Sequence, residues 1–117
     1  MNRSEALELV KSRVKNANLV KHMLAAEAIM RALASRFGGD PDTWGMAGLL
    51  HDLDYDETFD KPEIHGLETA KELEAKGVDS KIIHAVLAHA CKAPMEKAID
   101  KRSTRRIPLR GFWWLAL

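Results

Sequence analysis

Four histidines and one aspartate spread along the chain are of the types that bind divalent metal ions. They are His22, the adjacent pair His51-Asp52, His65 and His89. Imidazole nitrogens and carboxylate oxygens that helices bring into one bundle core are common ligands of transition metals. The adjacent pair alone is a weak signal, but all four histidines lie in segments with helical spacing and can converge. The sequence therefore predicts a metal site.

Not every titratable residue belongs to this prediction. A single histidine beside an apolar stripe is more often an ordinary core or surface residue, and His84 fits that interpretation because it lies away from Ile82 and Val86. The acidic stretch from Asp54 to Glu57 is expected to be a solvated loop. Asp54 is nevertheless close enough to His51 to support a ligand or to accept a proton.

The elements that must position these residues are all predicted to be helices, because apolar residues recur every three or four positions and no strand alternation occurs. The predicted helices begin at Ser4, Asn18, about Asp42, Pro62, Asp79 or Ser80, and Pro94. The third is expected to reach Asp52. The fourth is expected to bury Ile64, Leu67, Ala70 and Leu73. The result is an all-α bundle of about five to six helices.

Composition favours one globular domain. The chain has 117 residues, 46% hydrophobic and 30% charged, with a net charge of +1, which gives no reason to expect nucleic acid or a membrane as partner. Cys91 is the only cysteine, so no internal disulfide forms, and a cytoplasmic location is expected. The N-terminus lacks the apolar core of a signal peptide, and no apolar run is long enough to span a bilayer.

The composition changes near residue 100. From Asp100 to Leu117 the only acid is Asp100, whereas five residues are basic, and Trp113 and Trp114 are two of the three tryptophans. The sequence is therefore divided into a helical domain over residues 1–99 and an atypical basic and aromatic tail over residues 100–117.

The ordered histidines and aspartate resemble the HD-domain superfamily of metal-dependent phosphohydrolases. The matching segments are Leu19 to Leu33, Ala47-Gly48-Leu49-Leu50-His51-Asp52-Leu53-Asp54, His65-Gly66-Leu67-Glu68-Thr69-Ala70, and Ile82 to His89. The similarity covers about residues 4–99, and the ordered set is far more specific than the doublet. It implies an HD-type helical bundle.

By this resemblance, His22, His51 and Asp52 would hold one ion, and Asp52 would bridge to a second ion held by His65 and His89. One or two divalent transition ions are implied, of iron, manganese, nickel or zinc.

The resemblance implies hydrolysis of a nucleotide or other small phosphoester by metal-activated water. Asp52 and Asp54 are the predicted catalytic residues. The alternatives are a di-iron oxygenase on similar ligands, or an inactive domain that binds metal and oligomerises.

The chain departs from the family pattern at its end. The family closes the first metal site with a later aspartate, commonly followed by Thr-Gly, and continues for several helices. Here Asp100 is the only acid after Glu96, and no Thr-Gly follows. Asp100 is retained as a predicted ligand of an impaired site, in a domain expected to lack the later helices.

The tail from about Asp100 is predicted to be frame-shifted. Tryptophan has a single codon, so the bases that encode Phe112-Trp113-Trp114-Leu115 are nearly fixed. When the reading frame is shifted by two bases, these codons encode Leu, Val, then Ala or Val. With permitted codons upstream, the same frame yields an aspartate and Thr-Gly. The alternative is a divergent natural terminus. Uncovered apolar faces would favour association, so a homodimer or larger oligomer is expected.

Overall fold

The computed structural model describes residues 1–90, which form six α-helices and one 3-10 turn. The elements are α1 (Arg3–Arg13), α2 (Ala17–Phe37), α3 (Pro41–Leu50), α4 (Tyr55–Thr58), η1 (Pro62–Ile64), α5 (Leu67–Ala75) and α6 (Ser80–His89). No strand occurs in this part of the chain, so the all-α prediction is confirmed. None of the helices within residues 1–90 is long and apolar enough to cross a membrane. The predicted helix from Pro94, Asp100 and the tail lie outside the described residues.

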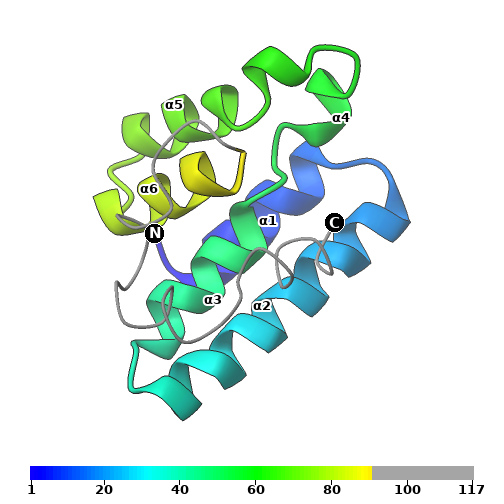
Figure 1. The fold of residues 1–117 in the computed structure, drawn as a ribbon. Helices are drawn as coiled ribbons and strands as arrows, with labels where there is room; N and C mark the ends of the chain where they lie inside the picture. Colours follow the sequence, from blue (N-terminus) through cyan, green and yellow to red (C-terminus); the bar gives the residue numbers. More distant parts are fainter. Residues whose placement is uncertain (91–117) are drawn as a thin grey trace.

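Helix α3 lies at the centre of the bundle (Figure 1). It packs against α1, α2 and α6, and α5 packs against α6. Every residue of α3 from Trp44 to Leu50 is buried, which is the pattern of a helix surrounded by others. The core around it includes Val10, Met23, Leu73 and Val86. Residues that follow α3 directly are therefore held in the interior.

A glycine allows α2 and α3 to approach closely. A Cβ atom added at Gly48 would lie 2.8 Å from the backbone oxygen of Ala26 and 3.0 Å from the backbone nitrogen of Glu27. Because both atoms belong to the backbone of α2, neither can move away as a side chain would. Gly48 therefore sets the distance between the helices that carry His22 and His51.

The first helices begin earlier than predicted. The side chains of Asn2 and Asn16, rather than Ser4 and Asn18, accept hydrogen bonds from the first turns of α1 and α2. Helix α3 likewise starts at Pro41 after the cap Asp40. Several capping side chains are available in each segment, and packing decides which is used. The predicted start of the fifth helix is confirmed, since Asp79 caps α6 at Ser80.

The segment between α3 and α5 differs most from expectation. Helix α3 ends at Leu50, so Asp52 lies beyond it, and the acidic stretch predicted as a loop contains the single turn α4. The predicted helix from Pro62 is divided into η1 and α5, because Gly66 adopts a left-handed conformation with φ of 85°. Leu67, expected to be buried, is 42% exposed.

Candidate metal centre

Five of the six predicted ligand residues lie within the described part of the chain, and their side chains meet; the sixth, Asp100, lies outside it. The five form two groups, His22–His51–Asp52 and Asp52–His65–His89, and within each group the possible ligand atoms lie within 4.8 Å of one another. His22 comes from α2, His65 follows η1, and His89 ends α6. His84 belongs to neither group. Asp52 is shared by both groups.

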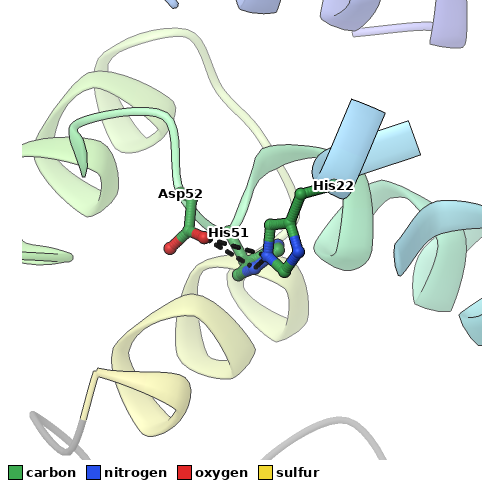
Figure 2. Close-up of side chains that lie close together, drawn as sticks. All are labelled: His22, His51 and Asp52. Atoms are coloured by element: carbon green, nitrogen blue, oxygen red, sulfur yellow. Dashed lines mark hydrogen bonds and ion pairs between the residues drawn. The ribbon is translucent and has the colours of Figure 1, made fainter. Parts of the chain in front are cut away.

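The first group is compact, and Figure 2 shows His22 directed toward His51 and Asp52. Oδ2 of Asp52 lies 3.2 Å from Nε2 of His22 and 3.0 Å from Nε2 of His51. The two Nε2 atoms are 3.1 Å apart. Three atoms that can each bind a cation thus lie next to one another.

The backbone fixes the tautomer of His51. Its Nδ1 lies 2.6 Å from the carbonyl oxygen of Gly48, and a carbonyl oxygen can only accept, so Nδ1 carries the proton. In the neutral ring Nε2 then presents a lone pair to the carboxylate of Asp52. A second proton on the ring or a cation at Nε2 makes this contact attractive, and a divalent ion fits it.

The second group surrounds the other oxygen of Asp52. Oδ1 lies 3.3 Å from Nε2 of His65 and 3.7 Å from Nε2 of His89. It is buried, yet accepts no hydrogen bond of good geometry from the described residues. A buried carboxylate oxygen that has only these two long contacts is poorly compensated for its loss of water. A metal ion held by Asp52, His65 and His89 would remove that cost.

The charges of the site depend on one another. Burial alone would raise the pKa of Asp52, but contacts with His22, His51 and His65 hold it well below its usual range. Asp52, followed by Asp54, raises the pKa of His65 to about 9. Burial and nearby imidazoles lower the pKa of His89 to about 4. Without metal, His65 therefore carries a proton where an ion would bind, whereas His89 is neutral.

Asp54 lies behind His65. It is fully buried, and its carboxylate accepts from Nδ1 of His65 at 2.8 Å and from the backbone N–H groups of Gly66 and Thr69 at 2.9 and 3.0 Å. A carboxylate can only accept when ionised, so Nδ1 of His65 is protonated and Nε2 is directed toward Asp52. Asp54 thus orients a possible ligand.

A cavity of about 630 Å³ opens beside the two groups. Its lining includes His22, Asp52, His65 and His89, together with residues that the sequence did not predict as part of the site: Asn16, Asn18, Leu19, Tyr55, Pro62 and Ala90. No single periodicity marks these residues, because they come from the α1–α2 connection, the first turn of α2, α4, η1 and the end of α6. The sequence offered one signal only, the position of Tyr55 three residues after Asp52.

Comparison with known proteins gives one match. No curated protein and no solved structure is detectably similar to the chain. A family model described as the HD domain matches residues 19–111. The range includes all five metal-site residues and also Asp100.

Proposed function

The chain belongs to the HD domain family, and on that premise we propose that it is a metal-dependent phosphohydrolase that acts on a small phosphoester. One observation carries the proposal: the buried carboxylate of Asp52 is shared by two groups of imidazoles. A structural ion pair would need one cationic partner, whereas four histidines around one carboxylate suit metal ions.

The proposed ligands form two sets joined by Asp52. His22 and His51 would complete the first set, and His65 and His89 the second. Their nitrogen and oxygen atoms suit iron, manganese, nickel or zinc. When bound, such an ion lowers the pKa of coordinated water and neutralises charge on phosphoryl oxygens. Asp100 is kept as a proposed additional ligand.

The chain's own residues have distinct tasks in this proposal. Asp52 supplies the negative charge that both sets share, and the carbonyl of Gly48 holds His51 in the required tautomer. Asp54 orients His65 and favours its charged or metal-bound form. Because Asp54 already receives three donors, we assign it orientation of His65 rather than proton transfer. The adjoining cavity would receive the substrate, for which a nucleotide is one proposed class.

Metal content tests the ligand assignment. Protein purified without chelator should carry a first-row transition ion. His51→Ala and Asp52→Ala should each lower the metal content markedly, whereas His84→Ala, in α6 but outside both groups, should not. Equal metal content in all three variants would contradict the proposal.

Phosphate release tests the reaction. A screen of nucleotides and simple phosphoesters should reveal hydrolysis that requires manganese or iron and is lost with chelator or in Asp52→Ala. Activity that survives both treatments would indicate a contaminant. Oxygen consumption by iron-loaded protein without phosphate release would favour the oxygenase, and metal binding without either reaction would favour an inactive domain. Self-association and a cytoplasmic location stay predictions.

A further inference from the structure

Tyr55 is an exposed aromatic residue at the candidate metal centre. It is the only tyrosine of the chain, it begins α4, and 43% of its surface is exposed. Its side chain lines the cavity that contains Asp52 and His65. The metal chemistry proposed above does not use it, so its place beside the reaction site needs another explanation.

The turn that carries Tyr55 is anchored by two of its acidic side chains. A single helical turn is unstable by itself. In α4, Glu57 accepts from Nε and Nη2 of Arg13 at 2.9 Å each, and Asp56 accepts from the backbone N–H of Lys15 at 3.1 Å. These contacts tie α4 to α1 and to the connection before α2. The backbone that carries Tyr55 is therefore held beside the cavity.

The ring stands directly beside a proposed ligand. The rings of Tyr55 and His65 meet at 88° with centroids 5.7 Å apart. Leu19 and Pro62 line the same cavity and are apolar. A phosphoryl group at Asp52 and His65 would therefore have its ester substituent next to an aromatic and aliphatic wall.

We propose that Tyr55 is a specificity-determining residue, whose ring selects phosphoesters with a flat aromatic substituent over those with a small alkyl one. This inference rests on the proposed function and names the substituent that its site prefers. Aromatic pairs in offset or edge-to-face geometry add to the affinity gained by burial alone. The ring, rather than the hydroxyl, is the part that carries the preference.

The test uses phenylphosphonate and methylphosphonate, whose carbon–phosphorus bonds are not hydrolysed. Their affinities for the metal-loaded full chain are measured by calorimetry. The wild-type protein should bind phenylphosphonate about fivefold to tenfold more tightly. Tyr55→Ala should reduce this ratio about fivefold through phenylphosphonate alone, and Tyr55→Phe should keep it. Phe59→Ala is the matched control, because Phe59 is 72% exposed and next to α4 but does not line the cavity.

Each outcome of these measurements either supports or contradicts the proposed role of Tyr55. An unchanged ratio in Tyr55→Ala, an equal loss for both phosphonates, or a Tyr55→Phe variant that behaves like Tyr55→Ala would overturn the role of the ring and leave the proposed function standing. If metal-loaded wild-type protein binds neither phosphonate, the proposed function fails and the inference with it. Metal content is measured first, and Tyr55→Leu replaces any Tyr55→Ala protein that has lost its metal.

Discussion

The orientations of two imidazoles in this cluster are fixed by groups outside the two proposed ligand sets. The carbonyl of Gly48 accepts a hydrogen bond from Nδ1 of His51, and the carboxylate of Asp54 accepts one from Nδ1 of His65. Both Nε2 atoms are thereby left for Asp52 and a cation. Groups that orient metal-binding histidines in this way typically change metal affinity strongly when they are removed.

The first residue-scale prediction concerns Asp54. Asp54→Asn keeps the size of the side chain but removes the charge that favours His65 in its charged or metal-bound form. We expect metal affinity to fall about 10-fold to 100-fold, measured by competition with a chromophoric chelator. Asp60→Asn, a nearby exposed carboxylate, should leave the affinity unchanged. An Asp54→Asn protein that matches this control would contradict the assigned role.

The second residue-scale prediction concerns pH in the metal-free protein. Asp52 and Asp54 raise the pKa of His65 from 6.5 to about 9, so the folded state binds this proton more tightly than the unfolded state. The resulting stability is complete below pH 6.5 and is lost as the pH rises through about 9.

Thermal unfolding across this range measures the effect. The melting temperature of metal-free wild-type protein should fall between pH 6.5 and 9 by more than that of His65→Gln, whose side chain does not titrate. Parallel curves for the two proteins would show that His65 is not the source of the pH dependence.

At the scale of elements, the contact between α2 and α3 brings the first proposed ligand set together. Gly48→Ala places a methyl group 2.8 Å from the backbone of α2, so the helices must separate. We expect a loss of about 1–3 kcal/mol in the free energy of unfolding and weaker metal binding, because His22 and His51 move apart. Urea unfolding and metal titration measure these effects.

A control variant separates this effect from a general change in helix stability. Ser35→Ala alters an exposed position of α2 and should change neither the metal affinity nor, by more than about 0.5 kcal/mol, the free energy of unfolding. A Gly48→Ala protein with normal stability and metal affinity would show that α3 can shift without moving His51.

At the scale of the whole molecule, metal binding should couple to folding. The proposed ligands come from α2, the end of α3, the segment after η1 and the end of α6, so an ion would join parts that are distant in sequence. An ion at 100 times its dissociation constant adds about 2.7 kcal/mol. The melting temperature should rise by roughly 10 °C.

Differential scanning calorimetry with and without manganese or iron measures this shift. Asp52→Ala removes the carboxylate common to both sets, so its melting temperature should not respond to metal. An equal rise in wild type and Asp52→Ala would mean that the ion binds elsewhere on the chain.

The sequence by itself determined the helical body and the five residues that converge. Helix-forming periodicity is local, so His22 and His89 could be assigned to helices without knowing what packs against them. The cap at Asp79 depends on short-range geometry and was also predictable. The structure then confirmed that the four histidines and Asp52 lie together in one cluster.

Only the tertiary structure decided the surroundings of that cluster. The sequence predicts Asp54 in a solvated loop, yet its side chain is buried. There it accepts hydrogen bonds from the backbone N–H groups of Gly66 and Thr69. Tyr55 lines the cavity because Arg13, more than 40 positions earlier in the chain, anchors the neighbouring Glu57. Such contacts join residues far apart in sequence, and no local pattern records which distant donor will meet which acceptor.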